Sequence, residues 1–218
     1  MPPRAKARSG AKADSIPVRP ALSREFVAGH KRRRIMDAIA ELTAEQGYDA
    51  TKIGDIVRRA GVARKTLYDN FEGKEEVFLS AFDTAVEEAF VRIEAECAEV
   101  EGGWEERVQA GLAAFLGYIA ENPALARMCM IEALSATQTA TEHYEAAMQR
   151  FVELTKQTVP KDDQLPETIE ETLVGGVAWI VYQQIRRQEA EQAKDLLPEL
   201  SEFILAPFQS AAKAGGKR

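Results

Sequence analysis

Hydrogen-bonding side chains are concentrated in one short stretch of the chain, ARKTLYDN at residues 63–70. A single large aliphatic residue, Leu67, lies among them, so a helix formed here has one anchor and polar groups on its other faces. Such a helix is poorly suited to core packing and well suited to the major groove of DNA, where side chains bond to base edges and phosphates. The candidate DNA-contacting residues in it are Arg64, Lys65, Thr66, Tyr68 and Asn70.

Arg64 and Lys65 are the candidates for reading the base sequence. They stand at the N-terminal end of the helix, which usually meets the base edges. Arginine is the commonest reader of guanine because its planar fork makes two hydrogen bonds at once. The alternative, that both side chains contact only phosphate, stays open.

A preceding helix must position this one. Residues 52–60 place Ile53, Ile56 and Val57 on one face at helical spacing. Gly61 follows the last periodic residue, where a chain that leaves a helix often needs positive φ. The sequence therefore predicts a helix-turn-helix motif at residues 52–71.

The start of this motif carries two further candidates, Thr51 and Lys52. A threonine hydroxyl, free backbone N–H groups and a lysine charge at a helix N-terminus all suit a phosphate. We expect Thr51 to be the N-cap. Because Gly54 stands three residues later, the acid of a capping box is not expected.

The helices on both sides of the motif complete a recognisable unit. The pattern predicts one helix over Lys31–Gln46, opened by a basic run at residues 31–34 that we expect near DNA, and another over Lys74–Glu99. The run GYDATKIGDIVRRAGVARKTLYDNFEGKEEVF closely resembles the N-terminal domain of TetR-type transcriptional regulators. The matching features are the G-Y-x-A-T start, the A-G-V turn, the T-L-Y-x-x-F recognition helix and the K-E-E-x-F start of the next helix.

The resemblance covers about residues 28–83, and it implies roles for two side chains. Lys74 matches the phosphate-contacting lysine of the family, and Tyr68 resembles its backbone-contacting tyrosine. Asp69 and Asn70 replace the more usual aromatic–histidine pair. The resemblance also implies a homodimer on a palindromic operator in double-stranded DNA, and an unknown small-molecule effector bound by the C-terminal domain.

The charge distribution supports a nucleic-acid module. The net charge of −7 alone argues against DNA. Up to Lys74, however, the chain has 16 Lys and Arg against 9 Asp and Glu, and after it 12 against 26. A basic segment on an acidic remainder is the asymmetry expected of a DNA-binding module attached to another domain.

The rest of the chain predicts an all-α fold. Helical patterns are expected over residues 104–120, 123–134, 137–159, 165–191 and 193–212, with no strand-like alternation. The expected organisation is a disordered basic arm at residues 1–27, the DNA-binding domain at 28–88, an effector-binding and dimerisation domain at 89–212, and a frayed tail at 213–218. The arm is either a solubilising tail or a DNA contact.

Aromatic and methionine side chains of the C-terminal half are candidates for a ligand pocket. Methionine-rich linings adapt to irregular apolar ligands, although such residues also form ordinary cores. The predicted lining residues are Phe115, Tyr118, Met128, Tyr144, Met148, Phe151 and Trp179.

The most apolar helix, around LVGGVAWIVYQQI, and the final helix predict a dimer surface, since small residues let helices approach closely. An intramolecular core helix is the alternative. The predicted interface residues are Val174, Gly175, Val177, Ile180, Val181 and Phe203. A two-fold dimer would place two recognition helices on successive turns of the major groove.

Other chemistry finds little support. We identify no catalytic group, no metal site and no cofactor motif, and His30 and His143 have no metal-ligand spacing. Cys97 and Cys129 form no disulfide framework, and no apolar run approaches a membrane span, so we expect a cytoplasmic protein without a membrane partner.

The sequence therefore predicts a DNA-binding transcriptional regulator rather than an enzyme, a repressor released from its operator by a small apolar ligand. A ligand-independent regulator or an activator of the same fold is one alternative. An all-α small-molecule carrier or enzyme whose basic head is only a docking surface is the other.

Overall fold

The computed structural model describes residues 24–161 and 165–215, and every regular element in these two ranges is a helix. The all-α fold expected from the sequence is therefore confirmed. The helices are α1 (Arg24–Gln46), α2 (Ile53–Ala60), α3 (Arg64–Tyr68), α4 (Lys74–Glu99), α5 (Trp104–Glu121), α6 (Pro123–Arg127), a π-helix η1 (Met128–Glu132), α7 (Ala133–Ala136), α8 (Gln138–Thr158), α9 (Ile169–Arg186), a 3₁₀-helix η2 (Ala190–Leu196) and α10 (Leu197–Gly215).

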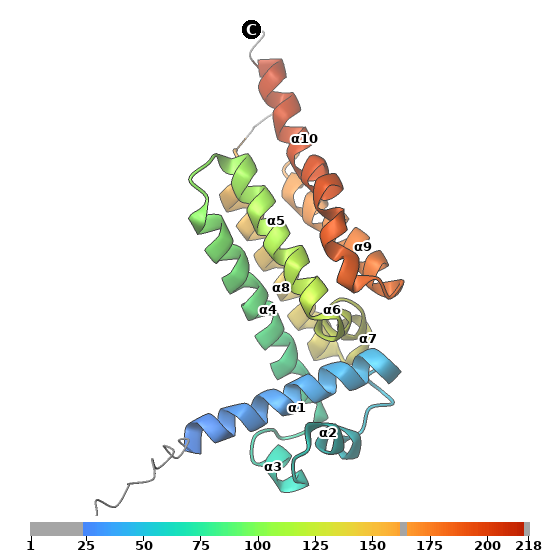
Figure 1. Cartoon of the computed structure of the whole chain (residues 1–218). Helices are drawn as coiled ribbons and strands as arrows, with labels where there is room; N and C mark the ends of the chain where they lie inside the picture. The colour runs from blue at the N-terminus through green and yellow to red at the C-terminus, as the bar shows by residue number, and fades with distance from the viewer. Residues whose placement is uncertain (1–23, 162–164, 216–218) are drawn as a thin grey trace, which may run out of the picture.

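The first three helices form a head at one end of the molecule (Figure 1). Helix α1 lies across the base of the upright helices, with α2 and α3 on its other side. Ile35 and Ile39 of α1, Ile56 of α2 and Leu67 of α3 are fully buried in one core. Leu67 is thus the anchor of α3 that the sequence predicts.

The boundary predicted for the N-terminal arm is wrong. Helix α1 begins at Arg24, so residues 24–27 belong to a helix rather than to a disordered arm. The remainder of the predicted arm, residues 1–23, lies outside the described residues, as do residues 216–218 of the predicted tail.

Helix α4 connects the head to the body, which comprises α5 to α10 (Figure 1). Its first half packs Val77 and Phe78 into the head core, and its second half buries Phe90 and Ile93 against the body. One uninterrupted helix of 26 residues therefore joins the two parts. The domain boundary at residues 88–89 falls inside it and stays a prediction.

The segment predicted as one helix over residues 123–134 is divided into α6, η1 and α7. Met128 and Ala133 of this segment are fully buried in the same core as the head helices. The head and the body are thus joined by side-chain packing as well as by α4. A π-helical turn widens the backbone, and such turns are often found at functional sites.

The last two predicted helices also differ from the structure. Helix α9 begins at Ile169, and the segment predicted from residue 193 starts with the 3₁₀-helix η2 before α10. Pro207 lies inside α10. In the described part of the chain no helix is long and apolar enough to cross a membrane.

Candidate nucleic-acid interface and apolar cavities

The turn between α2 and α3 depends on Gly61, as the sequence predicts. Gly61 has φ 61° and ψ 40°, a left-handed conformation that disfavours any residue with a Cβ. A Cβ there would also lie 2.5 Å from Nη2 of Arg34. This turn sets the direction of α3 relative to α2.

The start of α2 differs from the predicted capping. Lys52 rather than Thr51 is the N-cap, and its N–H donates to Oδ2 of Asp55 at 3.3 Å. Thr51 is fully buried, and its hydroxyl donates to the carbonyl oxygen of Gly47 at 2.8 Å. The predicted contact of this hydroxyl with a phosphate is therefore wrong in this structure, because the hydroxyl closes the turn after α1.

The exposed basic residues of the motif fall into two groups. Arg58 pairs with Asp55, and Arg59 pairs with two glutamates of α1, at 2.9 Å and 2.7 Å. The predicted DNA-contacting residues Lys52, Arg64 and Lys65 are also exposed but form no ion pair with any described residue. Their charges are therefore available to an external anion.

Tyr68 and Asn70 differ in how far their side chains are available to bind DNA. The side chain of Tyr68 is 50% exposed. Asn70 is half-buried, and its amide donates to the carbonyl oxygen of Thr66 at 2.7 Å. Asn70 thus stabilises the end of α3 in this structure, while Thr66 lies half-buried one turn before it.

Lys74 lies at the start of α4, beside the loop that follows α1. Its ammonium donates to the carbonyl oxygen of Tyr48 at 2.9 Å and stands 3.8 Å from the centre of the Tyr48 ring. A lysine ammonium has three donors, so two remain for other acceptors. The predicted phosphate contact of Lys74 stays a prediction.

The basic run at the start of the predicted first helix is used mainly within the protein. Arg32 donates to the carbonyl oxygen of Asn70 at 2.9 Å and to the hydroxyl of Ser80 at 3.0 Å, and it stacks over Phe71 at 4.2 Å. Arg33 binds Asp37 at 2.9 Å and also binds Glu88 of α4. Each guanidinium thus joins α1 to α4 or to the end of α3, and the expectation that the basic run lies near DNA stays a prediction.

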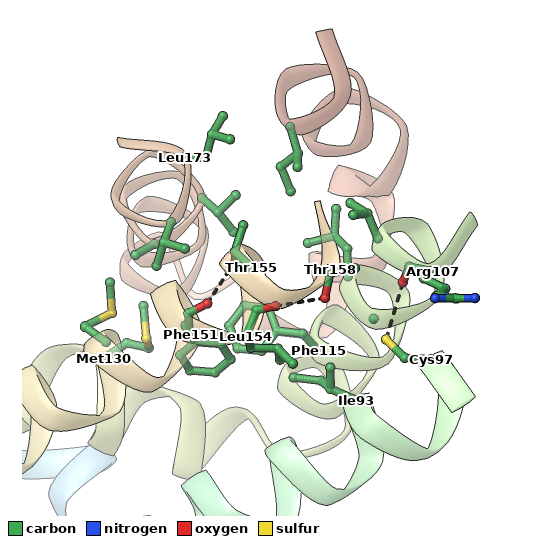
Figure 2. A pocket seen from close by; sticks show the side chains of 18 residues that line it. Ile93, Cys97, Arg107, Phe115, Met130, Phe151, Leu154, Thr155, Thr158 and Leu173 are labelled. Atoms are coloured by element: carbon green, nitrogen blue, oxygen red, sulfur yellow. Dashed lines mark hydrogen bonds between the residues drawn. The ribbon is translucent and has the colours of Figure 1, made fainter. Parts of the chain in front are cut away.

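The body encloses an apolar cavity of about 130 Å³ between α4, α5, α8, α9 and α10, which we call the outer cavity (Figure 2). Phe115 and Phe151 lie beside each other in it, with ring centres 5.3 Å apart. Arg107 and Cys97 lie at one end and Met130 at the other (Figure 2). Arg107 is the one charged residue among the described residues that line this cavity.

The polar groups of the outer cavity are few and mostly satisfied. The hydroxyls of Thr155 and Thr158 donate to carbonyl oxygens of their own helix at 2.9 Å and 2.8 Å (Figure 2). Cys97 donates to the carbonyl oxygen of Arg107 at 3.4 Å, and burial raises the pKa of its thiol. The cavity therefore suits an apolar ligand whose polar end lies near Arg107.

A second cavity of about 60 Å³, which we call the inner cavity, lies closer to the head. Its walls come from α4, α5, α6, η1 and α8, and Phe82 and Ala147 in them also belong to the core shared with the head. The residues that line both cavities are Phe115, Met130, Met148 and Phe151.

Only some of the predicted pocket residues line a cavity. Phe115, Met148 and Phe151 line both cavities, and Tyr118 and Tyr144 line the inner one. Met128 is fully buried in the core between head and body and lines neither cavity. Trp179 is 58% exposed on the outside of α9. Including these two in a pocket was wrong, because their helices turn them to other faces.

The predicted dimer residues are divided in the same way. Val181 is fully buried among α5 and α6, and Ile180 packs against that core. Val174 and Val177 line the outer cavity. Placing Val181 at the interface was wrong, because α9 turns it into the core. The assignment of the half-buried residues Val174, Val177 and Ile180 to the interface stays a prediction.

Gly175, Trp179 and Phe203 remain on the outer surface of α9 and α10. The Trp179 ring stacks on that of Tyr182, with centres 5.6 Å apart. A Cβ on Gly176 would lie 2.8 Å from the Phe203 ring, so this glycine allows the two helices to approach. Trp179, Tyr182 and Phe203 form what we call the aromatic face.

The described residues include no group of three or more His, Cys, Asp or Glu side chains that could hold a metal ion. The features present are a short helix with exposed cationic donors at one end and apolar cavities in a helical body. They define a helix-turn-helix protein with an attached helical domain. Residues 35–81 match the profile of "Bacterial regulatory proteins, tetR family", which confirms the resemblance that the sequence motifs predict.

Similarity to individual proteins points in the same direction. The "Fatty acid metabolism regulator protein" of Bacillus subtilis (strain 168) is 35% identical over 69 residues, which are 32% of this chain and 36% of that protein. The chain thus matches about a third of the length of this relative.

The whole fold has counterparts among solved structures. The fatty acid degradation regulator FadR from Bacillus halodurans is 19% identical with a TM-score of 0.74, over 80% of this chain and 94% of the other. The regulator FadR from Bacillus subtilis in complex with stearoyl-CoA is 17% identical with a TM-score of 0.64, over 79% and 96%. At these identities the likeness concerns the fold alone.

Proposed function

We propose that this protein is a transcriptional repressor that binds a palindromic operator as a homodimer. The observation that carries the proposal is the group of exposed basic residues Lys52, Arg64 and Lys65, which lack ion-pair partners among the described residues while Arg58 and Arg59 nearby are neutralised. Free cationic donors on α3, the second helix of the motif, and at the start of α2 suit base edges and phosphates.

The aromatic face supports dimerisation. Trp179 and Phe203 are 58% and 42% exposed, and large exposed aromatic residues are typical of protein interfaces. A two-fold axis beside this face would pair α9 and α10 with their copies and separate two heads for successive major-groove turns.

The effector we propose is a long-chain acyl compound, with its chain in the outer cavity and its polar end near Arg107. The apolar lining of that cavity supports the chain. The similar fold of a regulator that binds stearoyl-CoA supports the compound class. A ligand can release the operator only through its different affinities for the DNA-bound and free conformations.

The test uses fluorescence anisotropy of the purified full chain on DNA from upstream of its own gene, with nonspecific competitor DNA and increasing salt. We expect tight binding that survives competitor, with one dimer per palindrome, and weaker binding after addition of palmitoyl-CoA. Binding that competitor or moderate salt abolishes would show phosphate attraction alone and would favour a carrier with a basic docking surface. Specific binding that palmitoyl-CoA leaves unchanged would instead favour the ligand-independent regulator.

A further inference from the structure

The two cavities are separated by a wall of four side chains. Met130 and Met148 contribute two of them, and Phe115 and Phe151 contribute the other two. Methionine is unbranched and has three rotatable side-chain bonds, so it adapts to a changing neighbour at little cost. Met130 lies at the end of the outer cavity opposite Arg107, which is where a chain that entered beside Arg107 would arrive (Figure 2).

We propose that the inner cavity is a second subsite that receives the terminal carbons of a long linear apolar chain, and that Tyr118 reports its occupancy to the head. This inference rests on the proposed effector, because the rest of the chain would occupy the outer cavity. The partition opens when Met130 and Met148 change rotamer, so short chains stop at the wall and long chains pass it.

The lining of the inner cavity specifies what it accepts. Four of its wall residues are alanines, at positions 85, 89, 126 and 147, and all four are buried. Small side chains on three different helices leave the space open, and the cavity is less than half the volume of the outer one. A narrow apolar space at the end of a larger one fits the end of an unbranched chain and rejects a compact polycyclic ligand.

Tyr118 lines the inner cavity, and its hydroxyl bonds to a side chain that does not line the cavity. Its hydroxyl donates to Oε2 of Glu88 at 2.9 Å. Burial raises the pKa of Tyr118, and the Glu88 carboxylate raises it further, so the hydroxyl stays protonated and remains a donor. Glu88 in turn binds the guanidinium of Arg33 on α1.

This arrangement connects the cavity to the head through three side chains. When the end of a bound chain displaces the Tyr118 ring, the Tyr118 hydroxyl no longer donates to Glu88. The Glu88 carboxylate, which holds α1 against α4, then loses one of its hydrogen-bond donors. Arg33 also binds Asp37 at 2.9 Å, so it has a second acceptor on α1 when its contact with Glu88 changes. Arg33 then keeps Asp37 as its acceptor, while the tie between α1 and α4 through Glu88 is weakened, and the proposed ligand shifts the position of the head in this way.

The first test measures affinities by calorimetry for octanoyl-, lauroyl- and palmitoyl-CoA with the full chain. Ala147→Met fills the inner cavity, and Ala178→Met, the matched control, fills the outer one. We expect Ala147→Met to weaken the binding of palmitoyl-CoA by roughly tenfold, because about two methylenes of the ligand would no longer be buried. The affinity for octanoyl-CoA should be unchanged. Ala178→Met should weaken the binding of all three ligands.

The second test uses Tyr118→Phe, which keeps the ring and removes the hydroxyl. At saturating palmitoyl-CoA we expect a several-fold smaller effect on DNA anisotropy than in the wild type, with the response to octanoyl-CoA unaltered. Because this variant is isosteric apart from one oxygen atom, it remains informative if Ala147→Met does not fold.

Equal losses for all chain lengths in Ala147→Met would overturn the inner subsite, and an unaltered DNA response in Tyr118→Phe would overturn the role of Tyr118. Either result would leave the proposed effector intact. A wild-type protein that binds none of the three CoA esters would overturn both. A wild-type protein that binds them and also releases DNA, with the variants behaving as expected, supports both.

Discussion

Arg33 of the head and Tyr118 of the body bind the same carboxylate, that of Glu88 on α4. Arg33 is held by both oxygens of Glu88, and Tyr118 donates to Oε2 at 2.9 Å. The hydrogen bond to Glu88 raises the pKa of the Arg33 guanidinium. Helices α1, α4 and α5 therefore meet at one side chain.

The strength of this junction is measurable by a double-mutant cycle with Arg33→Met and Glu88→Gln. Both side chains are about 40% exposed, so water weakens the pair, and we expect a coupling of about 0.5–1 kcal/mol in urea unfolding. The cycle Arg150→Met with Glu87→Gln is the control, since that pair also joins α4 to the body but is 48% and 61% exposed. A junction coupling no larger than the control would contradict a special role for Glu88.

Replacing the free basic residues of α3 should weaken DNA binding. Arg64→Ala and Lys65→Ala should each reduce specific affinity by about 1–3 kcal/mol if the side chain reads a base, and a lysine that contacts only phosphate should lower the salt slope by about one. Competition anisotropy distinguishes these cases. Lys161→Ala removes the same charge from an exposed position far from the head in sequence, and a loss as large in this control would refute direct contact.

The two glycines of the motif should respond to alanine in opposite directions. Gly61→Ala should destabilise the protein by about 1–2 kcal/mol, because φ there is +61°. Gly54→Ala should stabilise it by about 0.5–1 kcal/mol, because Gly54 lies within α2 and a Cβ meets nothing within 4 Å. Chemical unfolding of both variants checks the pair, and losses of equal size would be inconsistent with the left-handed turn.

Glu132 of the π-helix should contribute to the junction between body and head. Its Oε2 accepts the N–H of Tyr48 at 3.3 Å, and its side chain is only 13% exposed beside Arg127. Glu132→Ala leaves buried donors without this acceptor, so we expect a loss of about 1–3 kcal/mol in urea unfolding. Glu132→Gln keeps an acceptor and should lose less, whereas a similar loss for the exposed control Glu145→Ala would contradict the assignment.

Stability at acid pH should depend on Glu121. Its hydrogen bond to Arg92, and then that to Lys194, lowers the pKa of this carboxyl from 4.5 to about 2. A lowered folded-state pKa contributes stability above the ordinary value, and that contribution is lost as pH falls toward about 2. Glu121→Gln should therefore be less stable than wild type at neutral pH, with the difference shrinking at about pH 3. Urea midpoints at both pH values check this, and a difference independent of pH would contradict it.

Much of the head followed from the sequence because its signals are local. Gly61 marks a left-handed turn, Leu67 is the one anchor of α3, and the start of α4 at Lys74 was read correctly to the residue. Each depends on the backbone conformation or periodicity of a few neighbouring residues. The predicted role of Thr51 failed because its hydroxyl bonds to Gly47, a contact made by the turn after α1.

The body could be assigned to helices from the sequence, but not the roles of its apolar residues. On α9, Val177 lines a cavity, Val181 is in the core and Trp179 is on the surface, although all three are large, apolar and close together. Periodicity shows that an apolar helix has faces, but the neighbours α5, α8 and α10 decide which face meets a cavity, a core or solvent. The sequence alone thus determined the all-α class, most of the helices and the helix-turn-helix motif. The two cavities, the aromatic face and the carboxylate shared by Arg33 and Tyr118 arise only when distant helices pack, because each is made by side chains that no local pattern brings together.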